Sequence, residues 1–534
     1  MVCGKTKYFT CGRRVVRNRV GRNGYSPGRS ARALALLGGS REGREVDIKK
    51  EALQRIVGAE FVIDDPKVLD SYASDSSYAA ARKPWYMVRP ANAEQVQAIV
   101  LWANETGAPL IPVSSGAPHL NGDTVPSVPE GVIVDLSRMK AIKRIDRRNK
   151  MVIVEPGVTY AELEPALAAE GLRISRPLLP RANKSVVASL LERQPTLIPR
   201  FNFSLPEPLR TCGVVWGSGE VAFTGEAGNG PMDLELQWKR GVAQVDPKGP
   251  NATDLMRLLT GAQGSMGIVI WASIKCELIP SVHKCVLVPA EKMEDLVDFC
   301  YKLERIRLGD EVMVVNAAQL ASMVATEAGE IALLKESLPA WAAIIGLAGA
   351  ALYPEERVAV QELELKRLAQ QCGVQLLNTL GNVSASRIAS AAASCSGETY
   401  YKFNFKGASR EIFFLTTMDK IPHFIATVFS VAERLKYPTQ DISIYVQPQH
   451  QGVSQHVEFN LPFDPGNHKE AEKVKQVYTE ASKALIAEGA YFSRPYGMWA
   501  DLVYGRDASA TRVLRTVKKI VDPNNVLNPG KLCF

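Results

Sequence analysis

The feature that most constrains this chain is a strand, a helix and a second strand that lead into a loop rich in glycine and serine. Residues 85–89 (WYMVR) and 110–113 (LIPV) are apolar runs typical of buried strands, and residues 92–106 repeat apolar side chains at helical spacing. The loop at residues 112–126 (PVSSGAPHLNGDTVP) contains two glycines and two serines. Glycines let a ligand approach the backbone closely, so that successive N–H groups can bind one anion. The loop is therefore either an ordinary surface turn or an anion site, for which a pyrophosphate is the natural ligand.

The rest of the chain alternates predicted strands and helices and has no apparent internal repeat. The apolar stretch between Pro339 and Pro354 is too short for a membrane helix and suits a buried strand and turn. This succession predicts an α+β fold with at least two sheets. Further strands are expected at residues 132–135 and 151–154, and helices at residues 48–57, 159–170, 294–303, 355–371, 419–435 and 468–488.

The composition is that of a globular protein with a large core. Of the 534 residues, 46% are hydrophobic and 22% are charged, which excludes a disordered or fibrous protein. The nine cysteines include no C-x-x-C pair, so we expect no zinc, no iron–sulfur cluster and no other metal. An odd number of cysteines without a secretory signal indicates reduced thiols, and we expect a cytoplasmic protein without a membrane span.

The positive charge of the chain is concentrated at its N-terminus. Residues 1–41 contain ten basic residues and no acidic one, so the net charge of +8 leaves −2 for the remainder. The charge therefore gives no reason to expect a nucleic-acid partner. The N-terminus could be an organelle transit peptide, a basic tail for an acidic surface, or a translated stretch upstream of the true start. We expect residues 1–45 to be a disordered extension.

Three further stretches, each compatible with a simple turn or cap, follow the loop. They are residues 154–160 (VEPGVTY), 261–269 (GAQGSMGIV) and 521–531 (VDPNNVLNPGK). In this order, and with residues 307–313 (RLGDEVM), they resemble flavoproteins of the vanillyl-alcohol oxidase and p-cresol methylhydroxylase family. The resemblance extends from about residue 50 to residue 534.

The resemblance implies an α+β architecture in which a two-part FAD-binding domain carries a cap domain. The cap domain, which binds the substrate, is built on an antiparallel sheet with helices. The implied boundaries are residues 46–280 for the FAD-binding domain, 281–490 for the cap, and 491–534 for a C-terminal segment that returns to the FAD-binding domain.

The resemblance also implies how FAD is bound, although it leaves covalent attachment open. The loop contains no lysine or arginine, so backbone dipoles must attract the two charges of the pyrophosphate. Lys531 is expected near the isoalloxazine ring. The loop residues expected to bind the pyrophosphate are Pro112, Ser114, Ser115, Gly116, Ala117, His119, Asn121 and Gly122; Pro156, Gly157, Val158, Ser189 and Glu192 are expected at the flavin and ribose, and Gly264, Gly267, Ile268 and Val269 at the adenine side.

The sequence departs from the family at the phenol-binding residues. Phenol oxidases of the family hold a phenolate with two tyrosines and an arginine, and this chain has Asn121 and Ser493 at the two tyrosine positions. Only Arg494 is present. The family's acidic residue also has no counterpart in residues 176–184. A site with an arginine and without the acid suits an anionic or carbonyl-bearing substrate rather than a phenol.

Among the six histidines, His456 is the best candidate for a catalytic base. It shares one face of a predicted strand with Ser454, Glu458 and Asn460, and that face is turned either to solvent or to a substrate. A neutral imidazole is the usual base near pH 7. We expect His456 to accept the substrate's proton, Arg494 to hold the substrate, and Tyr496 to shape the pocket; His450 is a weaker candidate.

We therefore expect an FAD-dependent oxidoreductase that removes a hydride from a C–H bond next to oxygen or nitrogen of a small substrate. O2 or an external carrier would receive the electrons, and a homo-oligomer is possible. One alternative is a 2-hydroxy-acid dehydrogenase of the glycolate or D-lactate kind. The other is a flavin-binding subunit without chemistry of its own.

Overall fold

The computed structural model divides the chain into two compact units, residues 1–48 and residues 49–534. The second unit contains all the elements discussed below except the first part of helix α1. Helix α1 (Arg41–Val57) begins seven residues before the predicted helix, and most of the expected extension at 1–45 lies outside the described residues. The structure describes residues 41–199, 207–241, 255–397, 399–450 and 453–534.

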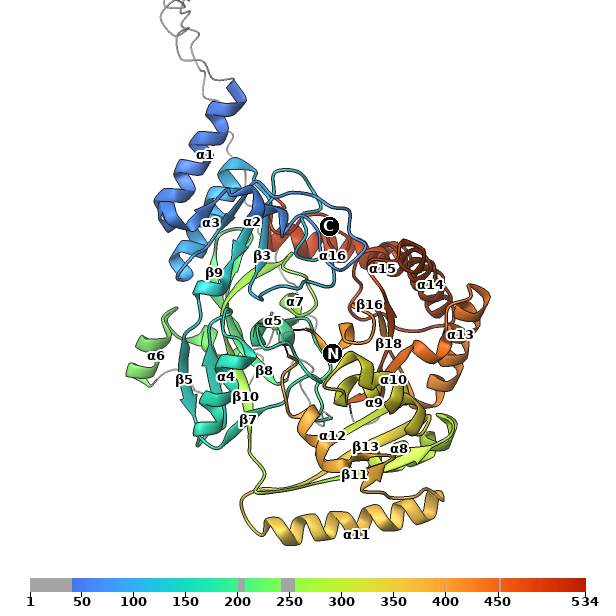
Figure 1. Cartoon of the computed structure of the whole chain (residues 1–534). Helices are drawn as coiled ribbons and strands as arrows, with labels where there is room; N and C mark the ends of the chain where they lie inside the picture. Colours follow the sequence, from blue (N-terminus) through green and yellow to red (C-terminus); the bar gives the residue numbers. More distant parts are fainter. Residues whose placement is uncertain (1–40, 200–206, 242–254, 398, 451–452) are drawn as a thin grey trace, which may run out of the picture. The chain divides into compact units, whose positions relative to one another are not determined.

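The first sheet is built from the predicted strand–helix–strand unit (Figure 1). Its order is β1-β2-β4-β3, and β4 pairs in parallel with both β2 and β3. Helix α3 (Ala93–Thr106) joins β2 to β3; the Asn92 side chain caps its first turn, and Gly107 ends it in the left-handed conformation. The three predicted strands are confirmed as β2 (Tyr86–Val88), β3 (Leu110–Val113) and β4 (Val132–Asp135). The sheet also contains β1 (Val62–Ile63), which was not predicted, and the short helix α2 (Pro66–Asp70) lies between β1 and β2.

The second sheet has six strands, and its pairs are antiparallel. The long strand β10 lies at its centre between β6 and β8 and also pairs with β7. The strands are β5 (Ile142–Asp146), β6 (Met151–Val154), β7 (Leu172–Ile174), β8 (Leu209–Trp216), β9 (Val221–Phe223) and β10 (Gly267–Leu278); the helices beside them are α4 (Tyr160–Ala169), α5 (Val186–Leu191), α6 (Leu234–Arg240) and α7 (Met256–Leu259).

The third sheet is the antiparallel sheet expected for the cap. Its order is β11-β13-β12-β17-β18-β16, and β13 confirms the strand predicted between the two prolines. Side chains along each strand alternate between the two faces of the sheet. Val312 and Val314 of β12 therefore belong to the hydrophobic cluster on one face, and Met313 and Val315 belong to the cluster on the other face. The strands are β11 (Val282–Ala290), β12 (Glu311–Asn316), β13 (Trp341–Gly349), β16 (Ala408–Thr416), β17 (Ser443–His450) and β18 (Ser454–Phe463), and a separate hairpin contains β14 (Thr379–Leu380) and β15 (Val383–Ser384).

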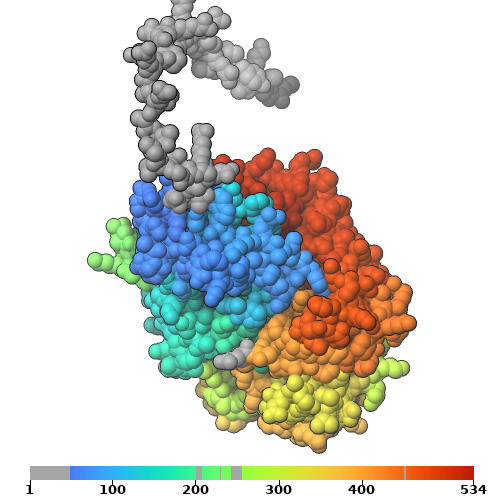
Figure 2. Space-filling view, turned by 45° about the horizontal axis from the view of Figure 1, so that its top comes forward, coloured from blue at the N-terminus to red at the C-terminus, as the bar shows by residue number. Residues whose placement is uncertain are grey.

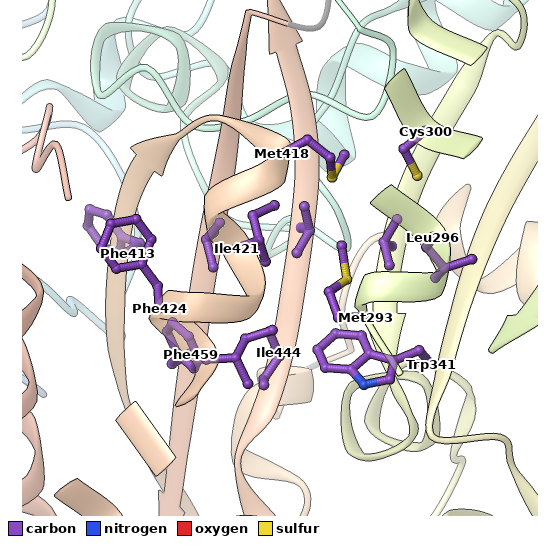
Figure 3. Packing of buried hydrophobic residues seen from close by; sticks show 14 of the residues in the cluster. Met293, Leu296, Cys300, Trp341, Phe413, Met418, Ile421, Phe424, Ile444 and Phe459 are labelled. Carbon is purple, nitrogen blue, oxygen red and sulfur yellow. The ribbon is translucent and has the colours of Figure 1, made fainter. Parts of the chain in front are cut away.

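Helices cover both faces of this cap sheet. On one face, helices α8, α11, α13 and α14 pack against a core that contains Phe413, Phe424 and Phe459 (Figure 3). On the other face, α9, α10 and α12 pack around Met313 and Ile344. The helices are α8 (Glu294–Arg305), α9 (Ala317–Val324), α10 (Ala328–Ser337), α11 (Pro354–Cys372), α12 (Ala385–Ala392), α13 (Ile421–Arg434) and α14 (His468–Ala487).

The C-terminal segment lies against the first sheet, as the red and blue regions of Figures 1 and 2 show. After α15 (Met498–Tyr504) and α16 (Ala508–Val521), the chain forms a β-bridge from Leu527 to Leu110 of β3. The Leu110 N–H donates to Val526 O at 2.7 Å, and the Asn528 N–H donates to Leu110 O at 2.8 Å. The end of the chain is thereby attached to the strand that enters the glycine loop.

The fold class is confirmed as α+β, with a two-sheet region and an antiparallel cap sheet. Among the described residues, no helix combines the length and hydrophobicity that a bilayer crossing requires.

Candidate active site

Two adjoining cavities lie along the glycine loop. The inner cavity, of about 130 Å³, extends from the loop to the cap residues Lys402, Glu411 and Glu458. The glycine-lined cavity, of about 110 Å³, extends from the loop to Gly264 and Gly267. The residues that line both cavities are Pro112, Val113, Ser114, Asp123, Ala188 and Glu192.

The glycine-lined cavity has largely apolar walls. Leu136, Leu191, Leu259 and Ile268 contribute to them, and no lysine or arginine is among its lining residues. An aromatic ring system such as adenine suits walls of this kind. A phosphate at the loop would have to be held by backbone N–H groups and serine hydroxyls, as the sequence predicts.

The first half of the loop is held by the segment before α5. The Gly116 N–H donates to Asn183 O at 3.0 Å, and Arg181 Nη1 donates to Gly116 O at 2.8 Å. Asn183 Nδ2 donates to Ala117 O at 2.8 Å. A Cβ at Gly116 would lie 2.7 Å from Asn183 Nδ2, so a larger residue would displace this amide. A side chain at this position would therefore break the Asn183 contact that holds the loop.

The second half of the loop is held by two other segments. The Gly122 N–H donates to Asp75 Oδ2 at 2.6 Å. Lys531 Nζ donates to Gly122 O at 2.7 Å and to Val125 O at 2.8 Å. Lys531, which was expected beside the isoalloxazine, lines neither the inner nor the glycine-lined cavity. Its ammonium is used to fix the loop.

The other predicted cofactor residues divide into lining and supporting groups. Val158 belongs to a buried core cluster, and Gly157 packs so closely that a Cβ would lie 2.6 Å from Leu136 O. Ser189 Oγ accepts from Tyr160 and donates to Gln194. These three residues line neither cavity, and the same is true of Gly116, Ala117 and Gly122. The inner cavity is lined by Pro112, Ser114, Ser115, His119, Asn121 and Glu192, and the glycine-lined cavity by Pro112, Ser114, Pro156, Glu192, Gly264, Gly267, Ile268 and Val269.

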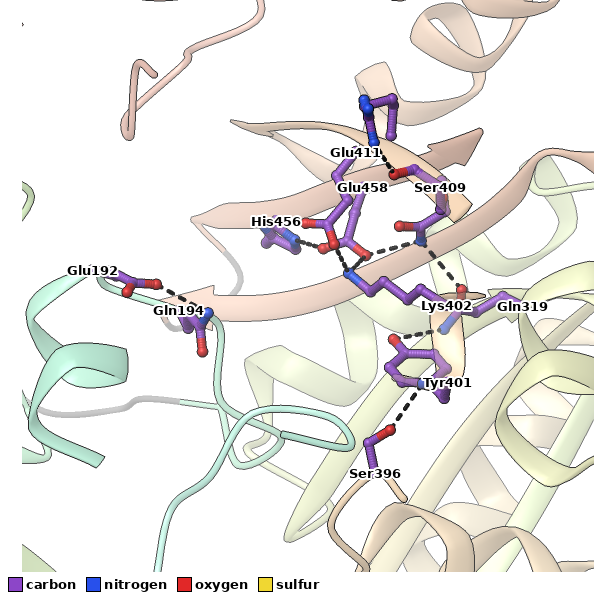
Figure 4. Close-up of polar contacts among 12 residues, drawn as sticks. Glu192, Gln194, Gln319, Ser396, Tyr401, Lys402, Ser409, Glu411, His456 and Glu458 are labelled. Carbon is purple, nitrogen blue, oxygen red and sulfur yellow. Dashed lines mark hydrogen bonds and ion pairs between the residues drawn. The ribbon is translucent and has the colours of Figure 1, made fainter. Parts of the chain in front are cut away.

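The cap side of the inner cavity is an ion network centred on Lys402 (Figure 4). Lys402 Nζ lies 2.9 Å from Glu411 Oε1 and 2.5 Å from Glu458 Oε1. Asn460 Nδ2 donates to the same Glu458 oxygen at 2.9 Å. The network joins the 3-10 turn at Tyr401–Phe403 to the neighbouring strands β16 and β18.

The charges of this network shift the pKa values of its members in opposite directions. Burial alone would lower the pKa of Lys402, but Glu411 and Glu458 raise it well above its usual value. Burial would raise the pKa of Glu458, but Lys402 and His456 lower it, so this group is a carboxylate. For Glu411 burial outweighs Lys402, and its pKa is raised. Glu411 is thus the more basic of the two carboxylates.

His456 lies on the predicted polar face of β18 but behind the cavity wall. Its side chain is 3% exposed, and Nε2 lies 3.4 Å from Glu458 Oε2. The ring packs against Phe413 and Tyr445 and is not among the residues that line the inner cavity. Burial, with Arg494 and Lys402, lowers its pKa to about 4, so the ring is neutral near pH 7. The side chain of His450 lies outside the described part of the structure.

Arg494 lines the inner cavity, with its guanidinium carbon 4.0 Å from the centre of the Phe413 ring. The residue is 6% exposed. Among the described residues its guanidinium makes no hydrogen bond and no ion pair, although its charge lowers the pKa of Glu411. Tyr496 also packs against Phe413, at 6.2 Å between ring centres, but it lines the glycine-lined cavity instead. The three predicted catalytic residues therefore meet around one ring, and only Arg494 reaches the inner cavity.

Several residues of the inner cavity were not predicted from the sequence. Glu458 was noted only for its strand face, and Glu411 shares the same alternating pattern with Ser409 and Phe413 on β16, which could have identified it. Lys402 lies in a 3-10 turn, and no pattern in the sequence indicated that it belongs to the site. The other unpredicted lining residues include Tyr400, Tyr401, Tyr445, Arg181 and Lys184.

This fold and site define an FAD-linked oxidoreductase. Residues 84–187 match the FAD binding domain, and residues 418–532 match the C-terminal domain of the FAD linked oxidases. The first match contains the glycine loop, and the second contains β18, Arg494 and the C-terminal segment. The chain is therefore an FAD-linked oxidase or dehydrogenase, and its cofactor is FAD.

Relatives and solved structures agree with this class. The chain is 22% identical to an uncharacterised FAD-linked oxidoreductase of Mycobacterium tuberculosis, over 89% of this chain and 96% of the relative. It is 25% identical to the mitochondrial D-lactate dehydrogenase (cytochrome) of Arabidopsis thaliana, over 47% of this chain but only 41% of that enzyme. The structure of p-cresol methylhydroxylase with substrate bound superposes with a TM-score of 0.77 at 19% identity, over 92% and 97% of the two chains, which confirms the predicted fold.

The described residues fit this cofactor. The cavities follow the loop, their apolar part suits an aromatic ring, and several N–H groups of the loop, such as those of Ser115 and Asn121, have no protein partner among the described residues. FAD supplies hydride acceptance when it is bound.

Replacing Gly116 with valine should abolish most of the flavin binding. The new side chain would displace Asn183 and distort the loop that presents its N–H groups. The measurement is the ratio of absorbance at 450 nm to that at 280 nm in the purified protein. Gly329→Val is the matched control, because a Cβ there meets nothing within 4 Å. Full flavin content in a folded Gly116→Val protein would contradict the role of the loop.

Two histidines of the site, the half-buried His119 and the buried His456, should titrate at low pH. Burial, with Arg181 and Lys184, lowers the pKa of His119 to about 4, and the pKa of His456 is also about 4. NMR of the imidazole resonances should give these values, whereas Glu311 should raise the pKa of His283 above 6.5. Because the unfolded rings titrate near 6.5, the two rings stabilise the fold above that pH, and this stability is lost as the pH falls towards 4. A His456 that titrates near 6.5 would contradict its buried placement.

Proposed function

We propose that this chain oxidises a small substrate that carries a carboxylate, specifically a 2-hydroxy acid. The single observation behind the proposal is the guanidinium of Arg494, which is buried in the inner cavity without an anionic partner among the described residues. A buried cation is costly to leave unpaired, whereas a carboxylate can pair with a guanidinium through two hydrogen bonds. An anionic substrate would supply the missing partner.

The other cations of the inner cavity already have protein partners. Lys402 is paired with Glu411 and Glu458, and Lys184 is paired with Glu192 at 2.5 Å. Arg181 donates to the backbone of the loop. Arg494 is thus the cation that is free to bind the substrate, which supports the role expected from the sequence.

Tyrosine hydroxyls provide neutral donors beside this anchor. Burial raises the pKa of Tyr400, so the hydroxyl keeps its proton near pH 7. Tyr400 lines the inner cavity, and its hydroxyl has no hydrogen-bond partner among the described residues. It can therefore donate to an oxygen of the substrate, which favours a carboxylate or carbonyl over an apolar group.

Glu411 is the proton acceptor that we propose in place of His456. His456 does not line the cavity, and its hydrogen bond is made to Glu458. Glu411 lines the cavity, and only its Oε1 is bonded to Lys402, so Oε2 is left for a substrate hydroxyl. Its raised pKa makes it a stronger base than an ordinary carboxylate. His456 then acts as a positioning residue that orients Glu458, and Glu458 in turn helps to hold Lys402.

In the proposed reaction the substrate loses two hydrogens and becomes a 2-oxo acid. The C2–H bond breaks, the hydride leaves to the flavin, the hydroxyl proton passes to Glu411, and a C=O bond forms. Arg494 holds the carboxylate and keeps C2 in a fixed place. The electrons then leave to O2 or to an external carrier.

Two lines of support separate this proposal from the other expectations. The similarity to the Arabidopsis D-lactate dehydrogenase favours a hydroxy acid. The tyrosines that hold a phenolate in phenol oxidases are replaced by Asn121 and Ser493, which argues against a phenol. The remaining alternative, a flavin-binding subunit without chemistry of its own, predicts a flavin that no substrate bleaches.

Replacing Arg494 with methionine should leave FAD bound and slow flavin reduction. Loss of the charge that holds the substrate should reduce the rate about 10²-fold or more. The measurement is anaerobic stopped-flow bleaching with D-lactate and D-2-hydroxyglutarate. Arg367→Met is the matched control, since Arg367 is exposed on α11. A wild-type protein that neither acid bleaches, or an Arg494 variant with the wild-type rate, would contradict the proposal.

Replacing Glu411 with glutamine should remove the proton acceptor while preserving its shape. The reduction rate should fall by about 10²–10⁴-fold. In the wild type the rate should rise with pH as Glu411 loses its proton, and the variant should lose this rise. His456→Gln should lower the rate less and keep the pH profile. If the profile is lost in His456→Gln and kept in Glu411→Gln, the base is His456.

A further inference from the structure

A larger cavity, the outer cavity, lies beside the inner one. Its volume is about 460 Å³, compared with about 130 Å³ for the inner cavity. Leu120, Asn121 and Glu411 line both cavities, so the two meet at the proposed proton acceptor. Nothing in the proposed reaction of the inner cavity uses this additional volume.

The walls of the outer cavity change in character from one end to the other. Tyr496, Met498 and Trp499 provide apolar surface, and Trp499 stacks on Tyr478 with 5.4 Å between ring centres. Trp499 and Tyr496 are 2% and 5% exposed, so this part is deeply buried. The remaining lining residues include four cations, namely Arg82, Arg410, Lys475 and Lys531.

Two of these cations, Arg410 and Lys475, lie over one exposed ring. The guanidinium of Arg410 lies 5.0 Å from the centre of the Tyr78 ring, and Lys475 Nζ lies 6.0 Å from the same ring. Tyr78 is 38% exposed and Lys475 is exposed, so this end faces solvent. A ligand that enters here would pass the positive charges first and the aromatic residues afterwards.

Polar groups of the outer cavity also lack partners. The Ser409 hydroxyl and Arg410 Nε are buried and have no hydrogen-bond partner among the described residues. Ser409 itself is 5% exposed. Buried polar groups without partners are rare in proteins and call for a ligand or ordered water. Both residues line the same cavity, on the side of strand β16.

The boundary between the two cavities is formed by Leu120, Asn121 and Glu411, which line both. Arg494 lines the inner cavity and Trp499 lines the outer one. A substrate anchored at Arg494 can therefore extend past Asn121 into the outer cavity.

We propose that the outer cavity binds the distal part of an elongated substrate. That substrate is a 2-hydroxy acid with an apolar tail that lies along Tyr496 and Trp499 and a second anionic group that meets Arg410 and Lys475. The inference rests on the proposed function for the reacting end, and it adds the substrate class: a long hydroxy diacid rather than lactate.

The test compares three probes on the FAD-loaded enzyme: lactate, 2-hydroxyoctanoate and 2-hydroxyoctanedioate. Burial of the tail should raise kcat/KM for the two long acids at least about tenfold over lactate. The diacid should exceed the monoacid by about fivefold through its second carboxylate. Lactate that equals or exceeds both long acids would overturn the inference.

Two variants localise the effect. Arg410→Gln should abolish the preference for the diacid over the monoacid, and Met498→Trp should lower the ratio of either long acid to lactate at least about fivefold. Arg367→Gln and Leu333→Trp are matched controls, because both residues are exposed on helices outside the cavities. Ratios unchanged in both cavity variants would overturn the inference.

A binding measurement separates this inference from the proposed function. Octanedioate has no hydroxyl to oxidise, and its binding to the enzyme can be followed by calorimetry. If no hydroxy acid bleaches the flavin but octanedioate binds and Arg410→Gln weakens its binding about fivefold or more, the proposed function is wrong and the outer cavity remains an anion-binding site. If octanedioate does not bind, or binds Arg410→Gln equally well, the outer cavity is not this site.

Discussion

The site depends on one constraint: the glycine loop, which contains no lysine or arginine, has to keep one shape. Its backbone N–H groups could attract an anion only in that shape, because their dipoles are weak unless they converge. Distant segments impose the shape through Asp75, Asn183, Lys531 and Asn528, and Asn528 Nδ2 donates to both Asp123 O and Gln263 O. The C-terminal segment therefore helps to shape the glycine loop, although it is about four hundred residues from the loop in sequence.

The cap side is ordered by the buried charges of Lys402, Glu411 and Glu458. Such a network is a weak source of stability, because desolvation offsets much of the attraction between the charges. Its effect here is to define positions and protonation states. It holds Glu458 as a carboxylate, leaves one oxygen of Glu411 facing the cavity, and keeps positive charge near a neutral His456. Arg494 makes no hydrogen bond or ion pair with this network among the described residues, but its charge lowers the pKa values of Glu411 and His456.

Much of the fold could be predicted, because local pattern determines it. Strand β3 and helix α3 follow directly from apolar spacing and from the capping residues Asn92 and Gly107. The alternation on β18 correctly separated Val457 and Phe459, which join the core, from Glu458, which faces the inner cavity. Helix α1 was predicted too short, since its first turns are polar and carry no apolar periodicity.

The sequence by itself determined the glycine loop and the polar face of β18, and it predicted Arg494, which lines the inner cavity. A period of two or 3.6 residues specifies which face of an element a side chain occupies. Only the tertiary structure decided which side chain on that face reaches the cavity, because this depends on packing between segments far apart in the chain. It placed Glu458 in front of His456, brought Lys402 from a turn to both carboxylates, and bonded Lys531 to the carbonyls of the glycine loop.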